Sequence, residues 1–379
     1  MDLDLTAEQD LLRQTSERFI DDHLSLADLR ALIDAPDGPE VALGATYVTE
    51  SAELGWFAAL APEELGGGTV SGFGICDATI FAELRGSRLQ PGTFVDTNVV
   101  VAALVANGTD DHRNHVVTDL LAGHATAAWA LADPTGDWSG MRGVDVSATA
   151  SGQIHLSGTK AYVCDAHTAD WLLVTATGAV GPTQVLLATD HPGVTVEPLE
   201  TFDLTRKLCE VRLDDVVVDE SAVIGSIGGA TDAIGYQVDL ASVLSTAESV
   251  GAMDHLFDMT VAYCKDRTAF GRPIGSFQAV KHQVADSATL LEMSKAAAVA
   301  ATRDLQNAHP RASQSVSMAK AYVAEAGVEI AHKCWQNFGG IAYTWEHDFH
   351  LYLRRLTTSA SLYGSAVWHR ERVCRLEGM

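Results

Sequence analysis

The stretch DRTAFGRPIGSFQAVKHQVAD, Asp266 to Asp286, decides the fold. It begins with a charged turn and an aromatic-glycine pair, passes Pro273 and enters an amphipathic pattern. Apolar residues then recur at steps of 3, 4, 4 and 3, which predicts one buried face of a helix. These residues are Phe277, Val280, Val284, Ala288 and Leu291. An arginine, an aromatic residue and a glutamine at fixed spacing are suited to a planar, anionic ligand.

The composition is that of a globular protein. The chain has 379 residues, of which 47% are hydrophobic and 20% charged, enough for two or three domains or one large unit. The formal net charge of −25 argues against wrapping nucleic acid or lying on an anionic membrane. A repurposed DNA-binding protein would need a basic surface, so this rival class is disfavoured.

Cysteine usage and the N-terminal sequence indicate a cytoplasmic protein. The six cysteines form no CxxC pair and have no histidine at zinc-ligand spacing, so reduced thiols are expected. The opening MDLDLTAEQDLLRQ is acidic and amphipathic, unlike a signal or transit peptide. No uncharged apolar run is long enough to span a bilayer, so no membrane association is expected.

Three regions differ in periodicity. Residues 1–115 are helical in pattern, and Thr6 with Gln9 is predicted to form a capping box. Residues 116–228 carry short alternating runs, which predict a small antiparallel β-barrel or sandwich. Residues 229–379 return to the helical period and fit an antiparallel four-helix bundle. The fold class is therefore α+β, with an N-terminal helical domain, a middle β-domain and a C-terminal bundle.

This order, together with DRTAFGRPIGSFQ and WQNFGGIAYTWEHDFHLYLRR, resembles the acyl-CoA dehydrogenase family over the whole chain. The segments LTAEQDLLRQTSERF, PEELGGGTVSGFG and LSGTKAYVCDAHTADWLLVTA extend the likeness through the first two regions. The resemblance implies a flavoprotein that binds FAD between the β-domain and the bundle and completes the site with a neighbouring subunit. Such enzymes oxidise an acyl-CoA thioester to a 2,3-enoyl-CoA, with a carboxylate as base and the flavin as hydride acceptor.

The resemblance assigns a set of FAD-binding residues. They are Arg267, Phe270, Gln278, Gln336, Gly339, Gly340 and Tyr162. An arginine can neutralise a pyrophosphate, an aromatic ring can pack on the cofactor, and a glycine pair lets backbone approach it. Alternatives stay open at single positions: Phe270 as bundle core, Arg267 in a surface ion pair, and the glycine pair as a helix stop.

The flavin-facing β-domain departs from the family pattern. Relatives carry a Thr-Glu-Pro-Gly-x-Gly-Ser-Asp-like segment, whereas this chain has ALADPTGDWSGMRG at residues 130–143. Relatives also place a tryptophan and a hydroxyl residue against the flavin. Here Tyr162 and Cys164 occupy these positions. Tyr162 can still stack, but a thiol is a poor hydrogen-bond donor.

The general base is missing from both family positions. One position follows the last long helix, where this chain has TSASLYGSAVWHRERV and Gly364 or its neighbours. The other lies in the first bundle helix, before an arginine that helps hold CoA. There the alignment gives Ala241 for the glutamate and Ser242 for the arginine, and only Asp239 still matches.

Glu248 is a weak candidate for a displaced catalytic base. It lies seven residues beyond Ala241, which places it about 10 Å along the helix axis, whereas a base must come within about 3 Å of its proton. A bundle glutamate paired with an arginine is the competing interpretation. Glu346 is expected to be structural. His347 and His350 lack a third ligand, so no metal site is predicted.

Two functions compete for this chain. One is a non-catalytic subunit that pairs with a catalytic paralogue, as in α2β2 members that share flavin at the interface. The other is an independently active FAD-dependent acyl-CoA dehydrogenase with a displaced base. A non-enzymatic structural subunit is a further alternative. Expected partners are an acyl-CoA substrate, a paralogous subunit or a second copy, and an electron-transfer flavoprotein, in β-oxidation of fatty acids or sterol side chains.

Overall fold

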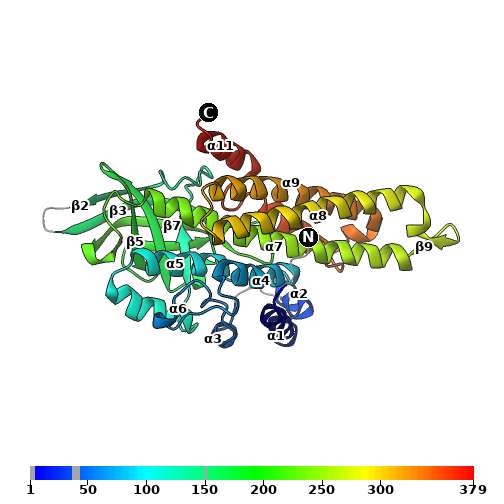
Figure 1. Ribbon diagram of the computed structural model, residues 1–379, viewed down its shortest axis with the longest axis horizontal. Coiled ribbons are helices and arrows are strands. Elements are labelled where there is room, and N and C mark those ends of the chain that lie inside the picture. The colour runs from blue at the N-terminus through cyan, green and yellow to red at the C-terminus, as the bar shows by residue number, and fades with distance from the viewer. Residues whose placement is uncertain (1–4, 36–42, 149–151) are drawn as a thin grey trace.

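The computed structural model describes residues 5–35, 43–148 and 152–379. Helices, then strands, then helices follow one another along the chain, as the periodicity predicts. The sheet lies at one end of the elongated molecule and the long helices extend to the other (Figure 1). The proposed domain limits at 115/116 and 228/229 stay predictions.

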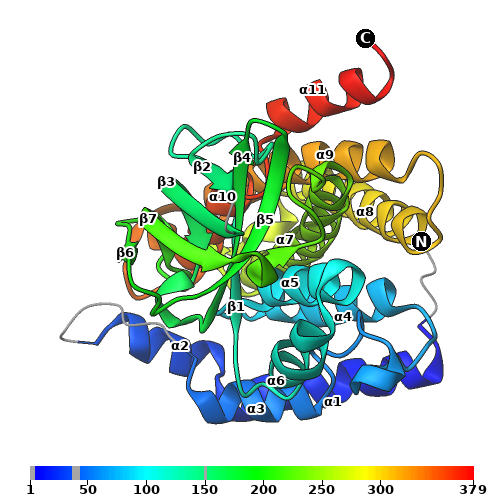
Figure 2. The same ribbon diagram turned by 90° about the vertical axis from the view of Figure 1, so that its left-hand side faces the viewer.

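The N-terminal region is helical. Its helices are α1 (Ala7–His23), α2 (Leu26–Ile33), α3 (Ala45–Glu53), α4 (Gly74–Ser87), α5 (Phe94–Asn107) and α6 (Thr118–Leu121), with a π-helical turn at His112–Val117. The predicted capping box forms, because Thr6 accepts from the Gln9 backbone and the Gln9 side chain accepts from the Thr6 backbone. Helix α5 contacts both β1 and α7, and so lies between the sheet and the bundle (Figure 2).

The middle region is an open, mixed sheet. Its strands are β1 (Ala127–Ala130), β2 (Val144–Ala148), β3 (Gln153–Cys164), β4 (Trp171–Gly178), β5 (Gly181–Ala188), β6 (Val194–Pro198), β7 (Leu208–Asp219) and β8 (Val223–Ile224). The order is β6-β7-β3-β2-β4-β5-β8, with β1 paired to β4. The described strands do not close into a barrel. The sheet is also not wholly antiparallel, because β1 and β2 pair with β4 in parallel.

The C-terminal region is a bundle of three long helices and one short one. They are α7 (Thr231–Asp266), α8 (Gln278–Gln306), α9 (Ala312–Phe338) and α10 (Phe349–Ser359). The hairpin of β9 (Thr268–Ala269) and β10 (Arg272–Pro273) joins α7 to α8 at the far tip, and α11 (Ala366–Leu376) packs on α9.

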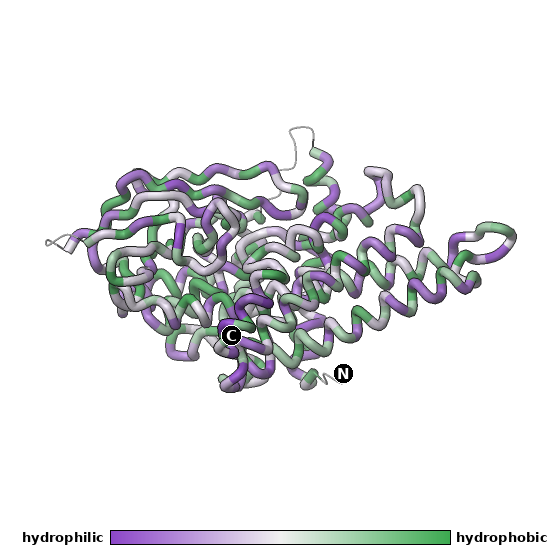
Figure 3. Tube along the Cα trace, turned by 90° about the horizontal axis from the view of Figure 1, so that it is seen from above, coloured by the Kyte–Doolittle hydropathy of each residue, from purple (hydrophilic) through white to green (hydrophobic). Residues whose placement is uncertain are grey.

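The predicted buried face of α8 is only partly covered. Leu291 is buried, whereas Phe277, Val280, Val284 and Ala288 are half-buried. The periodicity identified the helix correctly but overstated the burial, because this face is not fully covered within one chain. Hydrophilic and hydrophobic residues alternate along the long helices (Figure 3). Within the described ranges, no helix combines the length and apolarity that a membrane crossing requires.

Candidate functional site

The first family position for the catalytic base is a strained glycine. Gly364 has φ of 107°, a conformation that disfavours any side chain. A Cβ there would lie 2.7 Å from the Trp368 ring and 2.8 Å from Nε2 of His369. Ser365 begins α11 immediately afterwards and accepts a hydrogen bond from the Trp368 backbone. The turn therefore has no room for a glutamate without repacking two rings.

The second family position lies in the core of α7. Ala241 and Ser242 are both fully buried. The Ser242 hydroxyl has no hydrogen-bond partner among the described residues. A glutamate in place of Ala241 would bring a charged side chain into this packed interior, which costs several kcal/mol unless the charge is paired. Neither family position provides a carboxylate.

A buried carboxylate does lie beside Gly364, on a different element. The Tyr363 hydroxyl donates to Oδ1 of Asp96 at 2.6 Å, and the Trp129 backbone N–H donates to Oδ2 at 3.1 Å. Burial raises the pKa of Asp96 to about 7, although these two hydrogen bonds oppose the shift. Asp96 was missed at the sequence level. Its signal is a polar residue at the start of the apolar helix FVDTNVVVAALVAN.

Aromatic rings fill the space around this contact. The Tyr363 ring stacks on Trp129 at a centroid distance of 6.4 Å and lies 5.4 Å from the Trp138 ring. All three side chains are buried. The space next to the first base position is therefore occupied by the chain's own side chains.

The end of β3 carries the two residues that replace the flavin-facing pair of relatives. The register of β3 against β7 shifts between Lys160 and Val163, and Tyr162 has φ of 58°. Such an irregularity re-aims side chains. Tyr162 is 36% exposed, so its ring can be reached by a ligand. Cys164 is buried, with Sγ 3.6 Å from the Tyr363 hydroxyl, and burial raises the pKa of its thiol.

Glu248 forms a buried ion pair. Its Oε2 lies 2.8 Å from Nη2 of Arg206, and each side chain is 3% exposed. Burial disfavours the charged form, but the charges of Arg206, Arg355 and Arg85 outweigh it and lower the pKa of Glu248. A carboxylate with a lowered pKa and a guanidinium partner is a weak base. This is the paired arrangement that competes with a catalytic role.

The other predicted FAD residues gather at the far tip of the bundle. Arg267, Gln278 and Gln336 are exposed. Phe270 is 95% exposed, which excludes bundle core for this ring. Arg267 makes no ion pair with any residue of the described ranges, and thus differs from a typical surface pair. Phe270 and Gln336 line a cavity of about 370 Å³ that also includes Asn337.

The glycine pair ends α9. Gly339 has φ of 63°, which stops the helix, and this is the structural alternative considered for it. A Cβ at Gly339 or Gly340 would meet no atom within 4 Å. The backbone here is therefore approachable. Open backbone, an unpaired guanidinium and an exposed ring form a donor set that fits the pyrophosphate and adenine half of FAD.

These two groups of predicted residues do not meet in one chain. The hairpin that carries Phe270 is at one end of the long axis, and the sheet that carries Tyr162 is at the other (Figure 1). A single FAD cannot contact both within one chain. The residues fit FAD as two half-sites, one at the tip of the bundle and a reduced one at β3.

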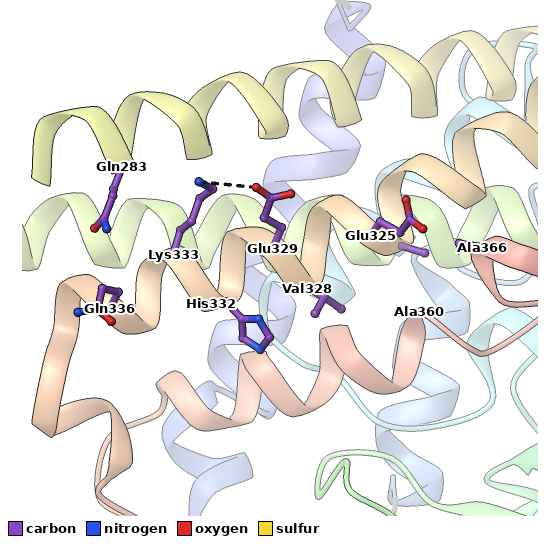
Figure 4. Close-up of a pocket in the computed structure, with 10 residues that line it drawn as sticks. Gln283, Glu325, Val328, Glu329, His332, Lys333, Gln336, Ala360 and Ala366 are labelled. Carbon is purple, nitrogen blue, oxygen red and sulfur yellow. Dashed lines mark ion pairs between the residues drawn. The ribbon is translucent and has the colours of Figure 1, made fainter. Parts of the chain in front are cut away.

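A groove extends along α9 between the tip and the turn that carries Gly364. It has a volume of about 610 Å³. Gln283 and Gln336 line one end, and Ala360 and Ala366 line the other (Figure 4). Lys333 and Glu329 form a 3.6 Å ion pair along its wall. The groove provides a continuous surface for a second molecule along α9.

The histidines of the 347–350 segment are engaged in packing. His347 lies edge-on to Phe338, and the Trp345 carbonyl lies 3.0 Å from Nε2 of His350. In the part of the chain that the structure describes, no cluster of three histidine, cysteine or acidic side chains could hold a metal ion.

Known proteins share both the domains and the fold. Family models for the acyl-CoA dehydrogenase N-terminal and C-terminal domains match residues 6–124 and 231–376. The acyl-CoA dehydrogenase IpdE2 of Mycolicibacterium smegmatis is 31% identical over 376 residues, covering 98% of this chain and 99% of that protein.

Two solved complexes are also similar. A chain of the ChsE4–ChsE5 complex from Mycobacterium tuberculosis superposes with a TM-score of 0.89 at 25% identity, covering 100% of this chain and 99% of its own. A variant of the steroid ACAD Tcur3481–Tcur3483 superposes with a TM-score of 0.86 at 26% identity, covering 98% of both chains. This protein belongs to the acyl-CoA dehydrogenase family, whose members are FAD-dependent oxidoreductases of lipid metabolism.

Proposed function

We propose that this chain is the non-catalytic subunit of a heteromeric acyl-CoA dehydrogenase. A paralogous catalytic chain supplies the base for α,β-dehydrogenation of an acyl-CoA. The observation that carries the proposal is the closure of both base positions. Gly364 is held at positive φ against two rings, and Ala241 lies in the core of α7.

In this proposal the tip of the bundle binds the partner's FAD. Arg267 neutralises the pyrophosphate, Phe270 covers the adenine, and Gln278 and Gln336 donate to uncharged edges. The unpaired guanidinium and the 95% exposed ring support these roles, since such groups are otherwise unstable choices for a surface. The bound flavin supplies hydride acceptance, and the residues of this chain bind and orient it.

The proposed substrate is a CoA thioester from fatty acid or sterol side-chain β-oxidation, with an electron-transfer flavoprotein as electron acceptor. The names of two solved relatives support this choice. One is a two-component ChsE4–ChsE5 complex, and the other is called a steroid ACAD with two components. In the proposed complex the partner's carboxylate removes the proton next to the thioester carbonyl.

Expression alone and with the neighbouring gene tests the assembly. We expect the lone chain to carry no flavin and to leave acyl-CoA unreacted. We expect the co-expressed pair to purify together, absorb near the flavin bands and reduce its flavin with an acyl-CoA. A lone chain that is yellow and reduces its flavin with a CoA thioester contradicts the proposal.

A matched pair of variants tests the role of the tip. Phe270→Ala should lower the flavin content of the complex without changing the stability of this chain, because the ring is already exposed. Phe202→Ala removes another exposed ring, 52% exposed and outside the tip, and should leave flavin content unchanged. Equal flavin content in all three complexes would remove the tip from the cofactor site.

One observation favours the alternative of an independently active enzyme. Asp96 is a carboxylate beside Tyr363, next to the first base position, and its pKa of about 7 suits a general base. In that case Asp96→Asn would abolish turnover, whereas a partner-supplied base predicts retained turnover in the folded complex. Measuring flavin reduction by a CoA thioester in the two complexes decides between them.

A further inference from the structure

A second cavity lies between the N-terminal helices and the β-domain, apart from the residues assigned to FAD. Its volume is about 230 Å³. The apolar wall includes Val48, Phe57 and Phe94, and the polar wall includes Arg85 and Asp165. It is therefore a small cavity with one apolar side and a buried cation.

Arg85 is a buried arginine without a carboxylate partner. Its side chain is 1% exposed, and its Nε–H has no hydrogen-bond acceptor among the described residues. Nη2 donates to the Pro91 carbonyl. The guanidinium also lies over the rings of Trp56 and Phe94, with centroid distances of 5.2 and 5.0 Å. These contacts leave its charge without a counter-ion in direct contact.

The neighbouring buried arginines are paired. Arg206 contacts Glu248 at 2.8 Å. Arg355 contacts Asp203 at 2.8 Å. Arg85 forms no ion pair within the described ranges and feels Glu248 only at longer range. Three guanidinium groups are thus matched by two carboxylates in direct contact, and Arg85 is the one left over.

An uncompensated buried charge is expensive to retain. Burial lowers the pKa of Arg85 to about 10, in part because Arg206 and Arg355 repel it. A charge without a counter-ion in an interior costs several kcal/mol, and cation–π contacts offset only about 2 kcal/mol. A neutral side chain of similar volume would pack here at lower cost. The charge therefore points to a ligand that completes the pair.

The walls limit the ligand to a small monoanion. Asp165 accepts backbone hydrogen bonds from Gly92 and Lys207, each at 3.2 Å. Asp170, nearer the surface, accepts from the Thr126 backbone at 2.8 Å. Two acidic residues in the wall disfavour a dianion such as phosphate, while the apolar side favours a short hydrocarbon chain.

We propose that this cavity is a binding site for a short-chain carboxylate, whose carboxylate group pairs with Arg85 and whose hydrocarbon part lies against Val48, Phe57 and Phe94. The site is separate from the proposed FAD half-sites and does not depend on which subunit supplies the catalytic base. Binding would place the missing counter-ion in direct contact with Arg85.

Butyrate and its uncharged isostere butyramide test the proposal. The full-length chain, in the assembly in which it purifies, is titrated by calorimetry at matched ionic strength. Thermal unfolding midpoints are recorded in parallel. Butyrate is expected to bind saturably and raise the midpoint, whereas butyramide should do neither. No binding of butyrate, or equal responses to the two compounds, would overturn the proposal.

Two arginine variants complete the test. Arg85→Gln should weaken butyrate binding at least tenfold. Arg88→Gln, at the end of the same helix, breaks surface pairs with Glu17 and Asp21 and should leave butyrate affinity unchanged. Unchanged affinity in folded Arg85→Gln also overturns the proposal. If that variant does not fold, the comparison of butyrate with butyramide on the parent chain still decides.

Discussion

The titration of Asp96 should make stability fall as pH rises. Its pKa is raised from 3.8 to about 7 because the carboxyl group is fully buried. The folded state therefore holds a proton that the unfolded state releases above pH 4. For such a group, the favourable contribution to stability is fully present below pH 4 and is lost as pH rises toward 7.

The size of the effect follows from the shift. About three pH units at about 1.4 kcal/mol each give roughly 4 kcal/mol when the effect is complete. Between pH 5 and pH 8 the linkage relation leaves about 2.5 kcal/mol. Asp96→Asn removes the titration. It also places an amide donor against the Tyr363 hydroxyl or the Trp129 N–H, and this cost does not depend on pH.

Urea unfolding followed by tryptophan fluorescence at pH 5, 6.5 and 8 measures the difference. We expect the free energy of unfolding of the variant, relative to the parent, to increase by about 2.5 kcal/mol from pH 5 to pH 8. Asp110→Asn is the matched control, since that side chain is 94% exposed. A relative stability of Asp96→Asn that does not change with pH would show that Asp96 is ionised throughout, and would refute the reasoning from burial.

Three further outcomes are expected. Glu248→Gln should lower the free energy of unfolding by about 3–5 kcal/mol because it leaves a buried guanidinium unpaired, while turnover of the folded complex stays unchanged; Glu325→Gln, in an exposed pair, should cost at most about 1 kcal/mol. Gly364→Ala should cost about 1–3 kcal/mol through positive φ and the ring contacts, whereas Gly235→Ala, within α7 and without neighbours, should be neutral or stabilising in thermal unfolding. Cys164 should label with a maleimide only on unfolding, because its thiol is buried and its pKa is raised; fast labelling of the native protein, read by mass spectrometry, would contradict this.

Local pattern predicted the element order, because helix and strand periods are set by residues close in sequence. The capping box of Thr6 and Gln9 is a local feature of this kind and is confirmed. The pairing of β1 and β2 with β4 was not predicted, because partners and register depend on residues far apart in the chain. Periodicity likewise identified the apolar face of α8 but not how much of it is covered.

The candidate site divides in the same way. The absence of a base at Gly364 and Ala241 was visible from alignment to the family pattern, because each is a single position in a recognisable motif. The partners of Glu248 and Asp96 were not visible, because Arg206 and Tyr363 reach them from segments far along the chain. An aspartate inside an apolar helix was the available signal for Asp96. Arg206 lies in a loop between strands and gave none.

The separation of the two half-sites explains how one can be lost while the other persists. Tyr162 and Cys164 at β3 are packed with Tyr363 and the interior, so a change there alters a buried core. Phe270 and Arg267 at the tip are exposed, so their replacement would cost this chain almost no stability. Residues that add nothing to their own fold and expose an apolar ring are a liability in a monomer. Their combination at the tip is therefore best accounted for by a second subunit, and this is why flavin content of the complex, and not the stability of the chain, is the decisive measurement for that end of the molecule.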